Sequence, residues 1–362
     1  MWKREDFGMG NAFKIKRTAD KRGPLRLLVI DFGSSSTRLA FLTRAKNHVR
    51  WEQAVLLPVA NEDWTFGPER KTIEDVLAEE KIDVEYISVL VSGGSGMFRL
   101  INFPGKPGGD AEALELQVRQ TLGVDEGYTV RCQLLQETAR DKDGREEHMV
   151  MAAAVPTTQI ARLRVWLEER KLKPVSLQVS GIATANLVRA DTELLQDPRG
   201  LGVLEISHSS SLLLIFYGRE LALARQFKFG SSMIIEALKS SFELDKETAE
   251  KFYASGSFDF SANVKPLMAP WLHQLGISLD FFERRFGRTV TSLHVFGSGG
   301  QSKVVEGLIS EHVRRPLRRW DPLRALRDLG KPVQEGLPLD AFACAVAEGA
   351  RKIGAGGRKN GL

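Results

Sequence analysis

Cysteine is scarce in this sequence of 362 residues, and no apolar run is long enough to cross a bilayer. The two cysteines, Cys132 and Cys344, lie far apart and belong neither to a CxxC pair nor to a metal-ligand spacing, so we expect no disulfide and no zinc site. The N-terminal residues are charged and lack the apolar segment of a secretory signal. These absences favour a protein of the reducing cytoplasm.

Two familiar nucleotide-binding patterns are also missing. The sequence contains no GxxxxGK[ST], and no GxGxxG leads from a strand into a helix at its first glycine-rich turn. The net charge is +5, but the basic excess is spread along the chain without interleaved aromatic residues. We therefore expect neither a P-loop or dinucleotide site nor a nucleic acid partner.

The sequence does contain an arrangement that occurs twice. Three strand-like runs follow one another between residues 25 and 57, and three more follow between 201 and 229. The chain is long for a single core, so this repetition predicts two lobes. Between them, the segment 86–155 combines strands with one helix, and helices dominate from 232 to 286.

Each lobe begins with an acidic residue followed by a turn of small residues. Asp31 precedes the turn 33–36 in "DFGSSS", and Glu205 precedes the turn 207–210 in "EISHSS". A predicted strand follows each turn directly, whereas P-loops and dinucleotide loops open a helix. We interpret both as hairpin turns whose amides hold phosphate, with the acidic residues facing a metal or its waters. For either turn alone, an ordinary hairpin is the alternative.

A third glycine-rich turn occurs at 297–300, between a predicted strand and a predicted helix in "VFGSGGQSKVVEGL". Glycines there allow the backbone to approach a flat base or ribose closely. A structural turn is the alternative interpretation.

Together these features resemble the superfamily of actin and the sugar kinases. Within it, the chain resembles the PilM-like proteins of type IV pilus assembly, which are related to FtsA and to the cytoplasmic domain of the type II secretion protein GspL. The stretches that carry this resemblance are "IDFGSSSTRLAFL", "RLINFP", "HMVMAAAVPTTQI", "VSLQVSGIATANLVRA" and "ARQFKFGSSMIIEAL". It implies an α/β, actin-like fold: two ribonuclease H-like lobes, with a small αβ subdomain inserted in the first lobe and a helical insertion in the second.

The resemblance also implies how the chain is divided. The expected parts are a mobile basic leader (1–24), lobe 1 (25–200) with its inserted subdomain (about 86–155), lobe 2 (201–335) with its helical insertion (about 234–286), a C-terminal helix returning to lobe 1 (336–353) and a flexible tail (354–362).

The implied function is a nucleotide-binding scaffold of a type IV pilus machine, or of a related type II secretion machine, at the cytoplasmic face of the bacterial inner membrane. A PilN-like inner-membrane protein would place its cytoplasmic tail in a groove between lobe 1 and the subdomain. Other components of the pilus machine would join it, and the chain would meet the membrane only through its partner. The implied cofactor is ATP or ADP with Mg.

The resemblance implies which residues contact the nucleotide and which bind Mg, the latter in part through water molecules. The nucleotide contacts are Asp31, Gly33, Ser34, Ser35, Ser36, Arg38, Glu205, Ser207, Gly230, Gly297, Gly299, Gly300 and Lys303. Asp31 and Glu205 are the expected metal ligands.

The second turn departs from the family, which has Asp and Gly at the positions of Glu205 and Ser207. Glu reaches further by one methylene, and a Cβ at Ser207 restricts φ and crowds the phosphate. His208 is either a solvent-facing loop residue or a phosphate contact, and Arg38, where Lys is usual, is either a phosphate contact or a surface charge. The predicted helix at 183–190 has no acidic residue to orient water, so we assign no catalytic residue and expect weak or lost binding with little or no hydrolysis.

Two alternatives stay open. A small-molecule kinase or ATPase of the same superfamily would need an acidic base facing a substrate cleft. An FtsA-like division protein would end in an amphipathic membrane helix, which the final "AGGRKNGL" does not resemble.

Overall fold

The computed structural model describes residues 25–45, 48–57, 73–92, 96–104, 111–140, 146–196, 199–255, 258–297, 299, 302–330, 332 and 337–354. The predicted leader (1–24), most of the predicted tail (355–362) and Gly300 lie outside these residues.

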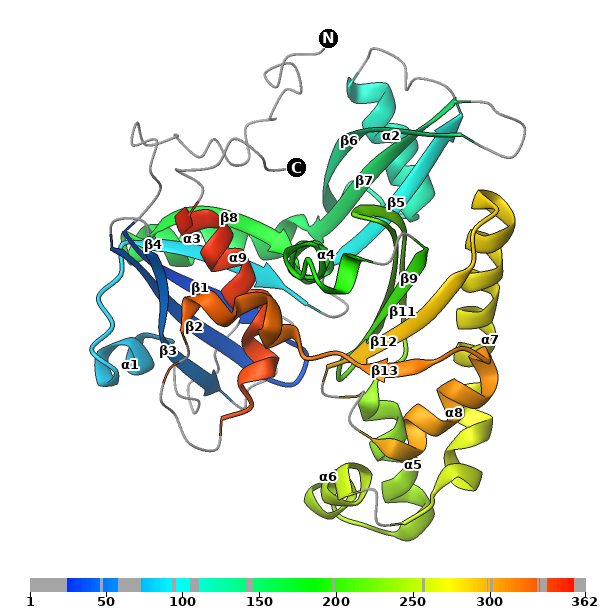
Figure 1. Cartoon of the computed structure of the whole chain (residues 1–362). Helices are drawn as coiled ribbons and strands as arrows, with labels where there is room; N and C mark the ends of the chain where they lie inside the picture. The colour runs from blue at the N-terminus through cyan, green and yellow to red at the C-terminus, as the bar shows by residue number, and fades with distance from the viewer. Residues whose placement is uncertain are drawn as a thin grey trace.

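The first sheet has the strand order β3-β2-β1-β4-β8 (Figure 1). Its first three strands are antiparallel neighbours, and β4 and β8 continue the sheet in parallel to β1. Successive residues of a strand point to opposite faces, so Leu28 and Ile30 pack under one layer of helices while Leu27 and Val29 pack under another. The strands are β1 (Arg26–Phe32), β2 (Thr37–Ala45), β3 (His48–Leu57), β4 (Tyr86–Val91) and β8 (Lys173–Val179), and the helices beside Leu28 and Ile30 are α1 (Ile73–Glu79) and α3 (Thr157–Glu169).

The second sheet repeats this topology in the order β11-β10-β9-β12-β13. Again three antiparallel strands are followed by two parallel ones. The strands are β9 (Gly200–Ile206), β10 (Ser211–Tyr217), β11 (Glu220–Phe227), β12 (Val290–Phe296) and β13 (Leu317–Arg319). One face is covered by α5 (Ser231–Phe242), α6 (Lys246–Ser255), α7 (Ser261–Phe286) and α8 (Lys303–Val313), which form their own core with it.

A third, smaller sheet lies beside the lobes in the order β5-β7-β6. It consists of β5 (Met97–Pro104), β6 (Tyr128–Arg140) and β7 (Glu146–Pro156), and it packs against α2 (Ala111–Leu122). Figure 1 shows this subdomain projecting from lobe 1, with β5 next to β11 of lobe 2.

The two lobes share one core, which is built around α4 (Ser180–Ala190) and α9 (Ala343–Gly354). It contains Val29 of the first sheet and Val203 of the second. α9 approaches β1 and β2 closely, because a Cβ at Gly349 would lie 2.6 Å from Leu42 Cδ1 and 2.9 Å from Val29 Cγ2. Short 3-10 segments at Leu194–Gln196, Pro322–Leu329 and Leu339–Phe342 complete the described fold.

Two secondary-structure elements differ from those expected from the sequence. α4 begins at Ser180, directly after β8, rather than near residue 183. The basic segment after α8 contains strand β13, which the charge pattern conceals, and Trp320 beyond it donates from Nε1 to Asp191 Oδ2 at 2.9 Å. Within the described residues, no helix is both long and apolar enough to cross a bilayer.

Candidate nucleotide cleft and partner groove

The two acidic turns have the same backbone closure. The Gly33 N–H donates to the Ser36 carbonyl at 3.1 Å, and the Ser207 N–H donates to the Ser210 carbonyl at 2.9 Å. Each turn joins the first and second strands of its sheet. Neither Gly33 nor Ser207 has a positive φ, so the expected φ restriction at Ser207 does not arise. Gly33 is required for space instead, since a Cβ there would lie 2.6 Å from the Ser36 oxygen.

Asp31 is buried at the end of β1, and both of its carboxylate oxygens have partners. Ser92 Oγ donates to Oδ1 at 2.9 Å, and the Arg38 guanidinium donates to Oδ2 at 3.0 Å. Arg38 is therefore an ion-pair partner inside the cleft rather than a free surface charge, with 18% of its side chain exposed.

Glu205 ends β9 and connects the two lobes. Thr184 Oγ1 of α4 donates to its Oε2 at 2.8 Å, and Ser207 Oγ donates to its Oε1 at 3.1 Å. Burial raises the pKa of Glu205, and the charge of Asp31 raises it further, while the two hydroxyls and Arg38 oppose the rise. The protonated carboxyl is thus favoured more than in water.

Gly230, another predicted nucleotide contact, packs behind the second turn. A Cβ at Gly230 would lie 2.3 Å from the His208 oxygen, and the first amides of α5, at Ser231 and Ser232, donate to the Ser207 and His208 carbonyls at 3.0 and 2.9 Å. This places Gly230 against the turn's own backbone.

The third turn packs on the same strand end. Gly297 has φ +94°, and Cβ atoms at Gly297 and Gly299 would lie 2.6 and 3.0 Å from the Ile206 oxygen. Lys303, the first residue of α8, is exposed. Ser34, Ser35 and Ser36 are half-buried in the first turn.

Unpaired polar atoms near the turns favour a phosphate-bearing ligand. Each of the three turns has a buried polar atom nearby without a hydrogen-bond partner: Arg38 Nε, Ser209 Oγ and Ser302 Oγ. Buried polar atoms in folded proteins are nearly always paired, so these atoms call for a polar ligand. Arg38 Nε can only donate, and a phosphate oxygen is a suitable acceptor.

The Arg38 guanidinium, paired with Asp31 at 3.0 Å, places a positive charge where a divalent metal was expected and disfavours it there. Mg²⁺ prefers carboxylate and water oxygens in octahedral geometry. All four carboxylate oxygens of Asp31 and Glu205 already accept hydrogen bonds from protein donors. No group of three or more potential ligands of His, Cys, Asp or Glu occurs in the part of the chain that the structure describes.

A separate groove of about 410 Å³ lies between lobe 1 and the subdomain, and we call it the partner groove. It is bounded by β6 and β8, which are edge strands of their sheets. Most of its lining side chains are apolar. The lining residues are Val89, Thr129, Arg131, Cys132, Gln133, Met151, Ala153, Val155, Ile160, Leu163, Leu167, Pro174, Ser176, Leu177, Gln178, Val179 and Ile182.

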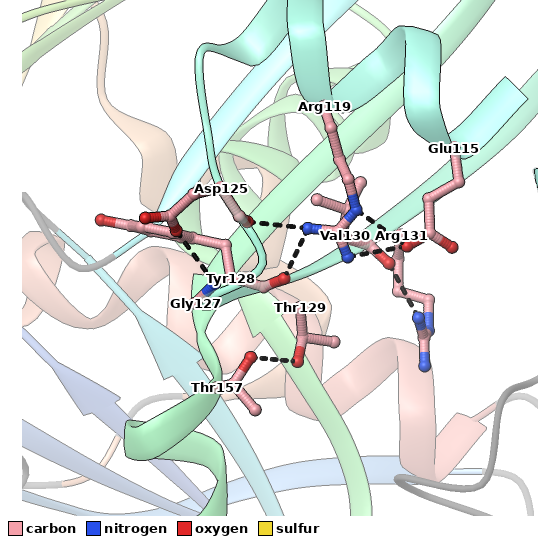
Figure 2. A network of polar contacts seen from close by, with 9 residues as sticks. All are labelled: Glu115, Arg119, Asp125, Gly127, Tyr128, Thr129, Val130, Arg131 and Thr157. Carbon is pink, nitrogen blue, oxygen red and sulfur yellow. Dashed lines mark hydrogen bonds and ion pairs between the residues drawn. The ribbon is translucent and has the colours of Figure 1, made fainter.

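A polar network within the subdomain reaches Thr157 at the start of α3 in lobe 1 (Figure 2), beside the partner groove that Thr129 and Arg131 line. Thr129 of β6 and Thr157 of α3 share a hydrogen bond of 3.0 Å, and the Thr157 N–H donates to the Gly127 carbonyl at 2.8 Å. Arg119 of α2 donates to the Asp125 and Tyr128 carbonyls, both at 2.9 Å. These contacts position β6, which forms one wall of the groove.

A buried cluster lies under the opposite wall of the partner groove. Ser176 Oγ of β8 donates to Glu348 Oε1 at 2.9 Å, and Arg351 donates to the same carboxylate at 3.0 and 3.2 Å. Glu348 is completely buried. Sequence reasoning did not identify the contacts Ser176–Glu348, Thr184–Glu205 and Ser92–Asp31, because the partners lie 21 to 172 residues apart in the chain and leave no local pattern.

The sequence matches no protein-family model and no curated protein. The PilM-PilN type IV pilus biogenesis complex is similar in structure, with a TM-score of 0.68 and 20% identity over 90% of this chain and 98% of that chain. A protein of unknown function with an actin-like ATPase fold from Bacteroides thetaiotaomicron has a TM-score of 0.46 and 10% identity, over 88% of this chain and 98% of that one. The cytoplasmic domain of EpsL from the Vibrio cholerae type II secretion system has 0.41 and 11%, over 89% and 95%. At these identities the likeness concerns the fold, and only the first score carries weight: the chain has the predicted actin-like fold, with two ribonuclease H-like lobes, a small αβ subdomain inserted in the first lobe and helices inserted in the second.

Proposed function

We propose that this chain is a nucleotide-binding, actin-like scaffold of a type IV pilus machine or a related type II secretion machine. In this proposal its partner groove takes the cytoplasmic tail of a PilN-like inner-membrane protein. The tail would hold the chain at the cytoplasmic face of the inner membrane, where other machine components join the complex. The domain division expected from the sequence belongs to the same proposal.

The partner groove is the observation that carries this proposal. Its apolar lining suits extended apolar peptide side chains, and the exposed edges of β6 and β8 offer backbone groups to a chain laid between them. It lies between lobe 1 and the subdomain, where the resemblance to PilM-like proteins predicts the tail.

The residues around the turns also support a low rate of ATP hydrolysis. Glu205 is engaged by Thr184 and Ser207, and α4 carries no acidic residue that could orient a water. Phosphoryl transfer depends mainly on positioning and on electrostatic stabilisation. The three turns would hold a nucleotide as a structural ligand, through the residues expected from the sequence.

Calorimetry with a synthetic PilN-like cytoplasmic tail tests the partner. Ala153→Trp places a large side chain in the partner groove and should weaken binding, whereas Ala262→Trp makes the same change at an exposed position on α7 and should not. Absence of a complex with wild-type protein would refute the pilus role. Rapid ATP turnover without a partner would refute the scaffold. Phosphorylation of a metabolite would favour the kinase alternative, and strong autonomous liposome binding would favour the FtsA-like one.

A further inference from the structure

The first turn already contains a cation, Arg38, fixed beside its acidic residue Asp31. Arg38 of β2 pairs with Asp31 across the first turn. Its Nη1 atom would lie 3.0 Å from a Cβ on Gly33, so the guanidinium extends over the glycine of this turn. The hydrogen bond to Asp31 is the contact that its guanidinium makes within the described residues, and its buried Nε has no partner.

A guanidinium can neutralise phosphate charge as a metal does, because it is always charged and its N–H groups match phosphate oxygens in a two-pronged geometry. A divalent ion at Asp31 would be repelled by this guanidinium, which lies 3.0 Å from the carboxylate. Each carboxylate oxygen of Asp31 and Glu205 also accepts a hydrogen bond from a protein donor.

We propose that this chain binds nucleotide without a divalent cation, with the Arg38 guanidinium in the place of the metal at the phosphates. This inference rests on the nucleotide binding in the proposed function. It extends that function by assigning the chemistry of the phosphate site to a residue of the chain.

Binding of ADP and ATP to the wild-type protein is measured by calorimetry in Mg²⁺ and again in excess EDTA. Equal affinity in the two conditions is the expected result. Loss of affinity on chelation overturns the inference, as does absence of binding in both conditions. Adenosine should bind more weakly than ADP, since it lacks the phosphates on which Arg38 acts. Equal affinities for adenosine and ADP would contradict the assigned role.

The variant Asp31→Asn best distinguishes a phosphate site neutralised by Arg38 from one neutralised by a metal. Asparagine has the same shape and can still accept from Ser92, but it removes a negative charge beside the phosphates and releases Arg38 from its ion pair. We expect Asp31→Asn to bind ADP at least as tightly as wild type, both in Mg²⁺ and in EDTA. A site in which Asp31 serves a metal would lose affinity in Mg²⁺ with this substitution, and that result would refute the inference.

Arg38→Gln should weaken ADP binding about tenfold or more through loss of charge-assisted hydrogen bonds. The single variant leaves the buried Asp31 without its ion-pair partner. The double variant Asp31→Asn with Arg38→Gln keeps the turn neutral and should show the same loss of ADP affinity. Arg38→Lys keeps the positive charge and should retain part of the ADP affinity that Arg38→Gln loses. Unchanged affinity in the folded double variant overturns the assignment. Binding of the PilN-like tail is measured on the same samples. If wild type binds the tail but binds nucleotide only with Mg²⁺, this inference is refuted and the proposed function stands. If wild type does not bind the tail, the proposed function is refuted.

Discussion

The hydrogen bond from Thr184 to Glu205 predicts a pH-dependent effect on stability. Thr184 is completely buried in α4, and its hydroxyl lies 2.8 Å from Glu205 Oε2 of β9. Valine has the same shape without the hydroxyl, so Thr184→Val removes this contact between the lobes with little change in packing. It leaves the Glu205 carboxyl with one donor fewer.

The expected cost follows from the chemistry of this contact. A hydrogen bond to a charged group contributes about 1.5–3 kcal/mol, and a neutral one about 1 kcal/mol. Burial raises the pKa of Glu205 from its ordinary value of 4.5, which favours the protonated form, so we expect Thr184→Val to lower the free energy of unfolding by about 1.5 kcal/mol near neutral pH.

The sign of the pH dependence is also determined. A carboxyl whose pKa is higher in the folded state contributes most to stability below its unfolded pKa, and the protein loses stability as pH rises from there toward the folded value. The Thr184 hydroxyl lowers the pKa of Glu205, so Thr184→Val raises it further. The loss in Thr184→Val should therefore be smaller in acid and larger at neutral pH.

Urea unfolding followed by tryptophan fluorescence, at acidic and at neutral pH, measures both effects. Thr184→Ser keeps the hydroxyl and removes only a methyl group, at a cost of about 1 kcal/mol that should not depend on pH. In a Glu205→Gln background, the pH-dependent part of the Thr184→Val effect should disappear. Equal losses for Thr184→Val and Thr184→Ser at both pH values would refute the reasoning.

Two further predictions concern the partner groove. Glu348→Ala should lower the free energy of unfolding by about 2 kcal/mol, because it removes a buried carboxylate that accepts from Ser176 and pairs with the partly exposed Arg351 and Lys352. Urea unfolding measures this, and a loss below about 1 kcal/mol, the range of an exposed ion pair, would contradict it. Cys132 should react slowly with iodoacetamide at neutral pH, since burial raises its pKa above the ordinary 9.0 and the thiolate is the reactive form. A bound PilN-like tail should slow this alkylation further, as followed by mass spectrometry, while buried Cys344 serves as the internal control; an unchanged rate with saturating tail would place the tail elsewhere.

Local patterns account for what could be predicted from the sequence. The turns at 33–36 and 207–210 combine an acidic strand end with small residues, and their backbone closures are each contained within four residues. The order of strands and helices follows from apolar periodicity in the same way. Contacts between Thr184 and Glu205, or Ser176 and Glu348, depend on how distant segments pack, and strand β13 is hidden by its arginines.

The departures from the family pattern in the cleft are better understood together than one by one. Considered separately, Glu205 and Ser207 are substitutions that weaken a phosphate-binding turn. In the structure, the Ser207 hydroxyl donates to Glu205, and the same carboxyl reaches Thr184 on α4, so the two residues form a link between the lobes. Arg38 pairs with Asp31 on the other side. Thr184 lies on α4, whose Ile182 lines the partner groove, so this link also restrains one element of the groove. We therefore predict that Thr184→Val, by loosening α4, reduces binding of the PilN-like tail even though Thr184 is not among the residues that line the groove. Calorimetry with the tail measures this, and unchanged affinity in the folded variant would refute it.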